Sequence, residues 1–430
     1  MHRILRSPFL IPAALAGLLA VAFLTGGHPA TGRAGRPVVV YAHPPCPPEL
    51  MALYRPIFDA FRRTHPHIDF RVLHITGNYE DKIKVMFAGR VAPDVIFMYP
   101  TALAAWVELG ALRPLDEYLV GRANVSRADY FPVMLATFTY RGRLYGLPKD
   151  ASVVIMEYNV DMFRRCGVAP SRPDWTWDDL LRAAQALTRD TDGDGRIDQW
   201  GMNAYDWWMF VWQNGGRILD ESGMRCALDE PAAVEALEFW AALRSRYGVT
   251  PTPEASADLG STRLFELGRV AMHFEMYPVV SIFRKTCGFE WDLAPMPRGP
   301  RGRASCAVGS ALAVTSQSRN PEAAFEFVRW MTSPAGMSGL VSVESPSCVE
   351  LARSPLFLDS PGLPKSKRVA IEAMDYARVP LQHSFYAEIM DVLNTELDSA
   401  QRGAVTVREA LSRAIPAVNR ILGRVPERSM

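Results

Sequence analysis

Four aspartates lie within nine residues in the segment DTDGDGRID, Asp190–Asp198. Carboxylates this close together repel one another unless a cation neutralises them, and a hard cation such as Ca²⁺ prefers oxygen ligands. The spacing matches the first nine positions of a calcium-binding loop, in which the sixth position is glycine and the seventh contributes only its backbone carbonyl. The expected metal ligands are Asp190, Asp192, Asp194, the carbonyl of Arg196, and Asp198.

The loop departs from the complete calcium motif at its twelfth position, where Gly201 stands in place of a bidentate glutamate. A bound Ca²⁺ would therefore take its last oxygen from elsewhere or from water. We expect such an ion to be structural, because no switch helix follows an intact loop. The alternative interpretation is an acidic turn that is solvated without an ion.

The composition is that of a large folded protein that binds rather than catalyses. The chain has 430 residues, of which 49% are hydrophobic and 22% charged, so two lobes or domains are expected. It contains no GxxxxGK[ST], HExxH or GxSxG motif, and no pair of carboxylates is marked as acid and base. We therefore expect a protein that is not an enzyme.

The N-terminal segment has the pattern of a secretory signal. Arg3 and Arg6 precede the apolar run Phe9–Leu24, and small residues follow. We expect residues 1–36 to be a signal peptide that is removed on export to the periplasmic or extracellular side, with an uncleaved membrane anchor as the alternative. The remaining chain has 43 Lys and Arg against 46 Asp and Glu, a net charge of −3 that does not favour nucleic acid.

Six cysteines lie beyond this segment, at positions 46, 166, 226, 287, 306 and 348. An even number in an exported chain permits up to three disulfides, while the absence of a CxxC pair argues against a zinc ribbon. A bridge between Cys287 and Cys306 is one expectation, and free buried thiols are the other.

Apolar periodicity predicts that strands and helices alternate in the first part of the mature chain. Strands are expected at 38–42, 68–75 and 95–97, with helices around 50–61 and 79–88 between them. This order is typical of a mostly parallel sheet with helices on both faces.

Later parts of the chain contain clear helix starts and one long connection. Thr176 with Asp179, and Thr406 with Glu409, have the spacing of capping boxes. The Pro- and Ser-rich segment Ser345–Lys367 is expected to be a surface connection.

Eight segments in order carry a resemblance to a known family. They are APDVIFM (Ala92–Met98), LGALRPLDEYL (Leu109–Leu119), RGRLYGLPKD (Arg141–Asp150), VIMEYNVDMF (Val154–Phe163), WTWDD (Trp175–Asp179), NGGRILD (Asn214–Asp220), RVAMHFE (Arg269–Glu275) and NPEAAFEFVRWMTSPAG (Asn320–Gly336). In this order and spacing they resemble the extracellular solute-binding proteins of ABC importers, of the maltose- and sugar-binding type.

The resemblance implies an α/β fold of two lobes, each a mostly parallel sheet flanked by helices, joined by a hinge that the chain crosses three times. The crossings are expected near Leu147, Cys306 and Ser347. The N-terminal lobe would then comprise residues 37–147 and 306–347, and the C-terminal lobe residues 148–305 and 348–430. The implied function is to capture a carbohydrate between the lobes, as a monomer, and to deliver it to a membrane permease.

Sugars present apolar ring faces and hydroxyl edges, which aromatic platforms and a few polar groups suit. The densest aromatic stretch is Tyr205–Gly216, in which Trp207 and Trp208 are expected to contact the ligand and Trp212 to lie in the core. The full set of ligand-binding residues that the resemblance implies is His43, Met98, Tyr99, Lys149, Asp150, Trp207, Trp208, Glu275, Tyr277, Phe385 and Tyr386.

Three other functions compete with this one. The ligand could be a non-sugar solute, such as a polyol, a sugar phosphate or a peptide. A secreted calcium-dependent glycoside hydrolase would need a paired-carboxylate cleft, which the sequence does not mark. A cell-surface adhesion module with dockerin-like loops would use the acidic loop twice, and this chain has it once.

Overall fold

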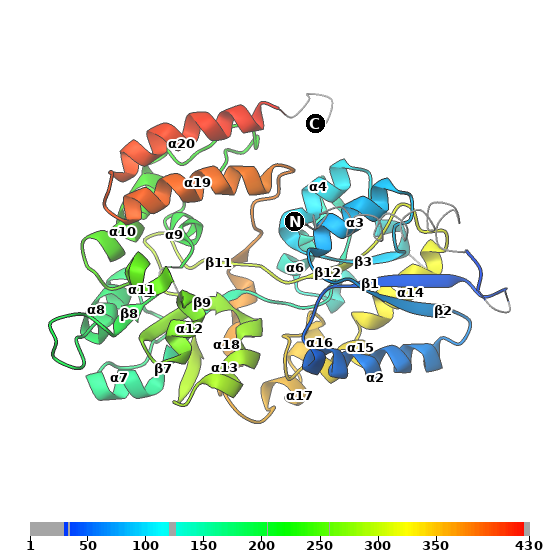
Figure 1. The fold of residues 1–430 in the computed structure, drawn as a ribbon, viewed down its shortest axis with the longest axis horizontal. Coiled ribbons are helices and arrows are strands. Elements are labelled where there is room, and N and C mark those ends of the chain that lie inside the picture. The colour runs from blue at the N-terminus through cyan, green and yellow to red at the C-terminus, as the bar shows by residue number, and fades with distance from the viewer. Residues whose placement is uncertain (1–29, 33–34, 120–125, 204, 258, 425–430) are drawn as a thin grey trace, which may run out of the picture.

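The computed structural model describes residues 30–32, 35–119, 126–203, 205–257 and 259–424. Two lobes, each with its own sheet, lie side by side along the long axis of the molecule (Figure 1). The predicted two-lobed α/β fold is therefore confirmed. Most of the expected signal peptide, residues 1–29 and 33–34, lies outside the described residues.

The first lobe is built on a five-stranded sheet in the order β2-β1-β3-β12-β6. Its strands are β1 (Val38–His43), β2 (Asp69–His74), β3 (Val95–Met98), β6 (Leu147–Pro148) and β12 (Ala311–Val314). Strand β1 is parallel to β2 and β3, whereas β12 runs antiparallel to β3 and β6. The apolar run of β1 is buried along its whole length, as expected for a strand that is covered on both faces.

Helices cover both faces of this sheet (Figure 1). They include α2 (Pro48–Thr64), α3 (Tyr79–Ala88), α4 (Leu103–Glu108), α5 (Asp116–Leu119), α6 (Pro132–Thr137), α14 (Pro321–Met331) and α15 (Pro334–Met337). Helices α2 and α14 pack on one face through aromatic rings, with Phe327 lying 5.1 Å from both Tyr41 and Phe61. On the other face, the hydroxyl of Tyr79 in α3 donates to the carbonyl of Ala42.

The second lobe has a four-stranded sheet in the order β10-β7-β9-β8. Its strands are β7 (Val154–Asn159), β8 (Trp200–Met202), β9 (Val270–Met276) and β10 (Trp291–Ala294). Only β8 and β9 are parallel, so this sheet departs from the expected mostly parallel pattern. The reason is that β7 leads the chain away from the first lobe, while β8, β9 and β10 all run back toward it.

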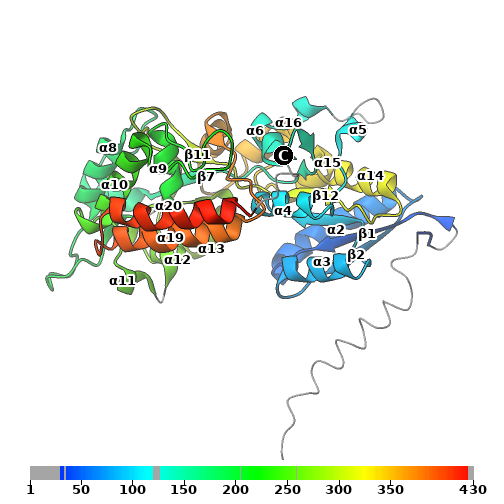
Figure 2. The same cartoon turned by 90° about the horizontal axis from the view of Figure 1, so that it is seen from above.

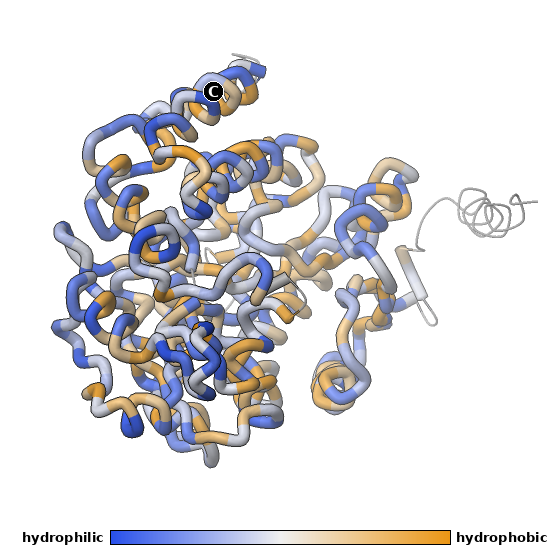
Figure 3. The backbone as a smooth tube through the Cα atoms, turned by 60° about the vertical axis from the view of Figure 1, so that its left-hand side comes forward, coloured by the Kyte–Doolittle hydropathy of each residue, from blue (hydrophilic) through white to orange (hydrophobic). Residues whose placement is uncertain are grey.

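Amphipathic helices surround the second sheet. They are α7 (Val160–Cys166), α8 (Trp177–Leu187), α9 (Trp207–Gln213), α10 (Pro231–Ser245), α11 (Pro253–Ala257), α12 (Gly260–Glu266), α13 (Val280–Thr286), α19 (Tyr386–Gln401) and α20 (Val407–Leu422). Figure 2 shows α19 and α20 side by side, and Figure 3 shows hydrophobic and hydrophilic residues alternating along the helices. The capping boxes predicted at Thr176 and Thr406 are both formed and start α8 and α20.

Three chain segments lie side by side between the two sheets. They are residues 149–152, 308–310 and 345–347. The amide of Lys149 donates to the carbonyl of Ser310 at 2.8 Å, and the amide of Ala151 donates to the carbonyl of Ser345 at 2.9 Å. The lobe boundaries given above stay predictions, but hydrogen bonds join the chain segments next to all three expected crossings.

The segment Ser345–Lys367 is not the surface connection that was expected. It contains α16 (Val349–Ala352) and α17 (Pro355–Leu358), and α18 (Arg368–Glu372) follows it. Phe357 is fully buried, with its ring 5.7 Å from that of Tyr277. Apolar side chains among the Pro and Ser residues hold this segment against the rest of the protein. The remaining strands are the pairs β4 (Thr139–Tyr140) with β5 (Arg143–Leu144) and β11 (Ser305–Cys306) with β13 (Ala377–Arg378).

All six cysteines lie in the part of the chain that the structure describes, and all are free thiols. The expected bridge between Cys287 and Cys306 is therefore wrong. Cys287 caps the end of α13, while Cys306 lies in β11, and the two pack in different hydrophobic clusters. Across the described ranges, no helix combines the length and apolar character that a membrane crossing needs.

Candidate functional site

A cleft between the lobes contains a polar compartment of about 520 Å³. This volume falls within the range of small-molecule sites, about 300–1,000 Å³. The first lobe contributes the loop after β1 and the start of α2, and the second contributes α13. The first two segments between the lobes reach it, and so do Val343 and Glu344, which directly precede the third. The polar and charged side chains of its lining are His43, Glu49, Tyr54, Tyr99, Lys149, Asp150, Ser152, Ser281, Lys285, Thr286, Ser310 and Glu344.

An apolar compartment of about 190 Å³ adjoins it. Tyr99, Met276 and Val308 line both compartments, so the two belong to one cleft. The lining of the apolar compartment includes no charged side chain, and its members are Tyr99, Pro100, Thr101, Trp208, Trp212, Ile218, Met276, Cys306, Val308, Pro380, Leu381, Tyr386 and Met390. All charged side chains of the cleft lining thus lie in the larger compartment, which is named polar for that reason.

A buried ion pair forms the floor of the polar compartment. The ammonium of Lys149 donates to Oε2 of Glu344 at 2.6 Å, and the hydroxyl of Tyr54 donates to Oε1 of the same carboxylate at 2.7 Å. The Lys149 ammonium also lies 5.2 Å from the centre of the Tyr54 ring. Burial raises the pKa of Tyr54, and the neighbouring Glu344 carboxylate adds to this effect. The three groups join the first segment between the lobes, and the residue just before the third, to α2.

Asp150 is a second buried carboxylate on this floor, and no cation lies within ion-pair distance of it in the described structure. Its oxygens accept hydrogen bonds from the hydroxyls of Ser310 and Ser152 and from the amide of Ser310. Burial raises the pKa of Asp150 to about 6, although the Lys149 ammonium opposes the shift. Because that ammonium is paired with Glu344, the floor holds two carboxylates and one ammonium.

His43 follows β1 directly and lines the same compartment. Burial lowers its pKa to about 4, so the ring is neutral at physiological pH. Its Nδ1 lies 2.7 Å from the carbonyl of Pro44 and therefore has the hydrogen as donor. Nε2 is then a hydrogen-bond acceptor, and it has no partner in the protein.

Aromatic rings from different elements meet in the apolar compartment. Trp208 and Trp212 come from α9, Tyr386 begins α19, and Tyr99 follows β3. The half-buried Trp208 packs edge to face on Trp207 at 5.5 Å. This arrangement presents ring faces beside a polar floor, as a ligand with one apolar face requires.

Of the residues expected to bind ligand, the structure brings six into the lining of the cleft. They are His43, Tyr99, Lys149, Asp150, Trp208 and Tyr386. The other five, Met98, Trp207, Glu275, Tyr277 and Phe385, lie outside this lining. The assignment of each of these residues to a ligand remains a prediction.

The five residues outside the lining have identifiable local roles. Met98 is buried in β3, where it pairs with Ala311 of β12, and Trp207 donates from Nε1 to Asn394 at 2.9 Å. The ring of Phe385 lies under the guanidinium of Arg424.

Successive side chains of a β-strand point to opposite faces, and at the end of β9 this alternation determines which side chain faces the cleft. Tyr277 is only 2% exposed and points into the core, whereas its neighbour Met276 is 38% exposed and lines both compartments. Glu275 turns its carboxylate back to accept from the amide of Met276 at 2.9 Å. The two expected residues, Glu275 and Tyr277, are therefore each one position away from Met276, whose side chain lines the cleft.

Sequence reasoning missed Tyr54, Glu344, Ser310 and Met276. Glu344 lies close to the expected third crossing, and a lysine near the first crossing that becomes buried needs a carboxylate partner. These two facts could have identified Glu344 from the sequence. Tyr54 has no comparable sequence signal, because it is one of several aromatic residues on the buried face of α2.

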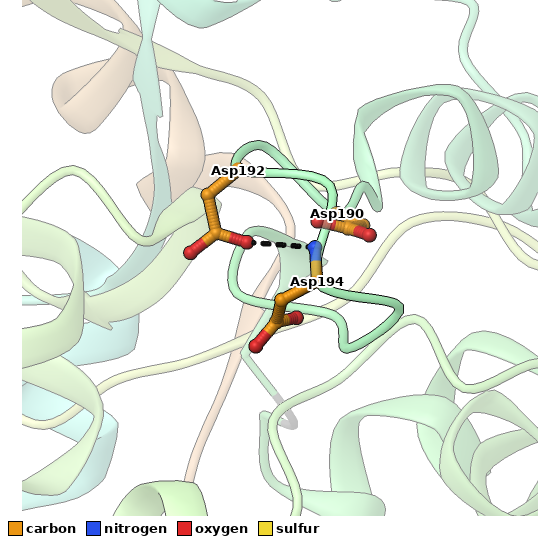
Figure 4. A group of neighbouring side chains, drawn as sticks. All are labelled: Asp190, Asp192 and Asp194. Carbon is orange, nitrogen blue, oxygen red and sulfur yellow. Dashed lines mark hydrogen bonds between the residues drawn. The ribbon is translucent and has the colours of Figure 1, made fainter.

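The acidic loop lies in the second lobe, away from the lining of the cleft. Single carboxylate oxygens of Asp190, Asp192 and Asp194 lie within 4.8 Å of one another (Figure 4). The same carboxylates accept backbone amides of the loop, such as Gly195 to Asp190 at 2.8 Å. Asp198 is not part of this group, since its carboxylate accepts from the amide and hydroxyl of Thr191.

The donor set of this loop fits a hard cation. Three carboxylates lie close together, and Arg196, whose carbonyl is the next ligand expected from the sequence, follows them in the chain. The structure does not bring Asp198 to the group, so a cation there would complete its shell with water.

Comparisons with known proteins place the chain in a family. The family model for bacterial extracellular solute-binding proteins matches residues 47–338. A putative binding protein of Brucella abortus is 26% identical over 53% of this chain, and the match spans about half, 56%, of that relative's length. A maltotriose-binding protein of Pyrococcus abyssi is 23% identical over 66% of this chain and 60% of its own. An sn-glycerol-3-phosphate-binding periplasmic protein of Salmonella typhimurium is 22% identical over 86% of this chain and 89% of its own.

Solved structures share the fold over almost the whole chain. An ABC substrate-binding protein from Listeria monocytogenes, in complex with cycloalternan, has a TM-score of 0.79 at 24% identity and covers 90% of this chain and 99% of its own. A cyclic α-maltosyl-1,6-maltose binding protein from Arthrobacter globiformis has the same TM-score, 0.79, at 20% identity, covering 91% of this chain and 100% of its own. With the family model matching well over half of its residues, the chain belongs to the bacterial extracellular solute-binding protein family.

Proposed function

We propose that this protein is the extracytoplasmic solute-binding component of an ABC importer. It captures a carbohydrate between its lobes and delivers it, as a monomer, to a membrane permease. It is exported and acts by binding rather than by catalysis.

The observation that carries this proposal is the two-sided cleft. Trp208 and Tyr386, both half-buried, contribute aromatic rings on one side, and the groups around Lys149, Asp150 and His43 offer hydrogen-bonding partners on the other. Sugars combine an apolar ring face with hydroxyl edges, so this division suits them. The relatives described above include proteins named for maltotriose and for a cyclic maltooligosaccharide.

Hinge closure explains how such a cleft would hold and signal its ligand. The three segments between the lobes are short and hydrogen-bonded, so the lobes can rotate about them. Ligand groups that contact both lobes stabilise the closed form, because only that form makes both sets of contacts. A permease that recognises the closed form would then distinguish loaded from empty protein.

A thermal-shift screen of the purified protein tests the proposal. The panel contains mono- and oligosaccharides, polyols, sugar phosphates and peptides. A ligand present at about 100 times its Kd stabilises the native state by about 2.7 kcal/mol. A shift with one sugar class, with the sugar recovered intact, supports the proposal. Breakdown of a glycoside, or shifts with peptides alone, contradicts it.

Trp208→Ala and Trp330→Ala form a matched pair for this screen. Both tryptophans are half-buried, but Trp330 lies outside the cleft on α14. Loss of a stacking aromatic costs about 2 kcal/mol or more in binding, which is roughly a 30-fold weaker Kd. We expect this loss for Trp208→Ala and an unchanged Kd for Trp330→Ala.

The second candidate function is uptake of a phosphorylated polyol. The glycerol-phosphate-binding relative favours it, because its sequence aligns with 86% of this chain, against 66% for the maltotriose-binding relative. A melting-temperature shift with sn-glycerol 3-phosphate and none with sugars would select this candidate.

We also propose that the loop of Asp190, Asp192, Asp194 and the Arg196 carbonyl holds a structural Ca²⁺. The converging carboxylates support this role. Added Ca²⁺ should raise the melting temperature and a chelator should lower it. Asp190→Asn should abolish the response, while Asp174→Asn, at an exposed position outside the loop, should retain it. An equal response in both variants would contradict the proposal.

A further inference from the structure

The buried floor of the polar compartment contains a hydrogen-bond acceptor without a donor and a carboxylate without a counter-charge. Nε2 of His43 is buried and has no partner in the protein, and the carboxylate of Asp150 is satisfied only by serine hydroxyls and one amide. The one buried donor with a positive charge, Lys149, is already engaged by Glu344 at 2.6 Å. A ligand in this compartment therefore meets one acceptor that lacks a donor, the Nε2 of His43, and no buried cation that is free to pair with it.

The charged side chains of the lining also give an excess of negative charge. The ionisable side chains that line the polar compartment, apart from the neutral His43, are two lysines and three carboxylates. At the rim, exposed Lys285 and Glu49 offset each other, which leaves the excess negative charge at Asp150. A buried charge without a counter-charge is unfavourable, and a ligand cation would remove this cost.

No charged side chain lines the adjoining apolar compartment. Trp208, Trp212 and Met390 line it together with other apolar groups, and it opens into the polar compartment at Tyr99 and Met276. One ligand can therefore reach both compartments only if one end is polar and the other apolar.

We propose that the ligand is a cationic hydroxylated compound, an amino sugar that bears an apolar substituent. This inference rests on the proposed function, since it names the class of carbohydrate that the same cleft takes. A protonated amine supplies the positive charge that Asp150 lacks, and it donates hydrogen bonds, as an unpartnered acceptor such as the Nε2 of His43 requires. A phosphate has acceptors and negative charge only, so it is disfavoured at the same place.

Binding of glucose, glucosamine and glucose 6-phosphate, measured by isothermal titration at pH 7.5, tests the inference. We expect glucosamine to bind at least tenfold tighter than glucose, and glucose 6-phosphate to bind most weakly. The phenyl glycoside of glucosamine should bind roughly tenfold tighter than glucosamine itself, because the ring is removed from water in the apolar compartment. Trp208→Ala should remove that last gain and leave the preference for the amine.

Two variants test whether the preference for the amine depends on the excess negative charge. Asp150→Asn should bring the affinities for glucosamine and glucose within about twofold of each other. Lys285→Glu, at an exposed position on the rim, adds negative charge without disturbing the core and should widen the gap between glucosamine and glucose 6-phosphate. An unchanged gap in Lys285→Glu, or an unchanged preference in a folded Asp150→Asn protein, would overturn the inference.

The outcomes separate this inference from the proposed function. Equal binding of glucose and glucosamine, or tighter binding of glucose 6-phosphate, overturns the amine preference alone. If none of these compounds binds and the wider carbohydrate panel is also negative, both the inference and the carbohydrate proposal are wrong.

Discussion

The buried ion pair between Lys149 and Glu344 is expected to be strongly coupled, and a double-mutant cycle can measure the coupling. The side chains are 3% and 14% exposed, and their charged atoms lie 2.6 Å apart. Removal of one partner leaves the other charge buried without compensation, which costs about 3–5 kcal/mol. We therefore expect Lys149→Met and Glu344→Gln each to lower the free energy of unfolding by an amount of this order.

The double variant should recover most of the loss. Methionine has a shape close to that of the lysine stem, and glutamine keeps an acceptor for the hydroxyl of Tyr54. Neither charge then remains to be paired, so the double variant should lie within about 2 kcal/mol of the original protein. The unfolding entropy of a 430-residue chain is about 0.9 kcal/mol per K, so each single variant should melt roughly 3–6 °C lower.

The surface pair of Arg141 and Glu108 serves as the matched control. Its atoms are also 2.6 Å apart, but the side chains are 46% and 25% exposed. Exposed pairs contribute about 0–1 kcal/mol, so Arg141→Met should change stability by no more than that. Urea unfolding at pH 7 gives the four free energies of the cycle. Additive losses in the Lys149 and Glu344 variants would refute the reasoning that the two charges depend on each other.

Three further predictions concern the fold and its response to pH. Thr176→Ala removes the side-chain cap of α8 and should lower stability by about 0.5–2 kcal/mol, with the exposed Ser412→Ala, inside α20, as a near-neutral control. Gly201→Ala places a methyl group against the backbone of Ala184 and should prevent normal packing of β8, while Gly288→Ala, which meets no atom within 4 Å, should be tolerated. The pKa of His43 falls to about 4 in the folded protein, so protonation favours the unfolded chain and stability is lost as the pH falls below about 6.5. The free energy of unfolding should fall between pH 7 and pH 5, and this fall should be about 2 kcal/mol smaller in His43→Asn than in the original protein. Equal falls in the two proteins would show that the ring is not kept neutral.

Local sequence patterns closely predicted the first three strands of the chain and two helix starts in the second lobe. The apolar run at Val38, the alternation before Ile75 and the helix starts at Thr176 and Thr406 each depend on neighbouring residues, and each element lies where it was expected. The antiparallel strands of the second lobe were not predicted, because strand direction depends on how distant segments return to a sheet.

The lining of the cleft was only partly predictable for the same reason. Lys149 and Glu344 are 195 residues apart in sequence and meet only because two segments between the lobes lie side by side. At the end of β9 the pattern placed an aromatic near the cleft, but only the structure shows that Met276 faces it and Tyr277 does not. The buried Phe357 shows that a few apolar side chains can fold a segment whose Pro and Ser content is typical of a surface connection.

The most direct test of the central claim is a crystal structure of the protein with the tightest-binding compound from the carbohydrate panel. The account predicts that the ligand lies between the lobes, with an apolar face on Trp208 and polar groups within hydrogen-bond distance of Asp150 and the Nε2 of His43. A ligand bound elsewhere, with this cleft left to water, would contradict it.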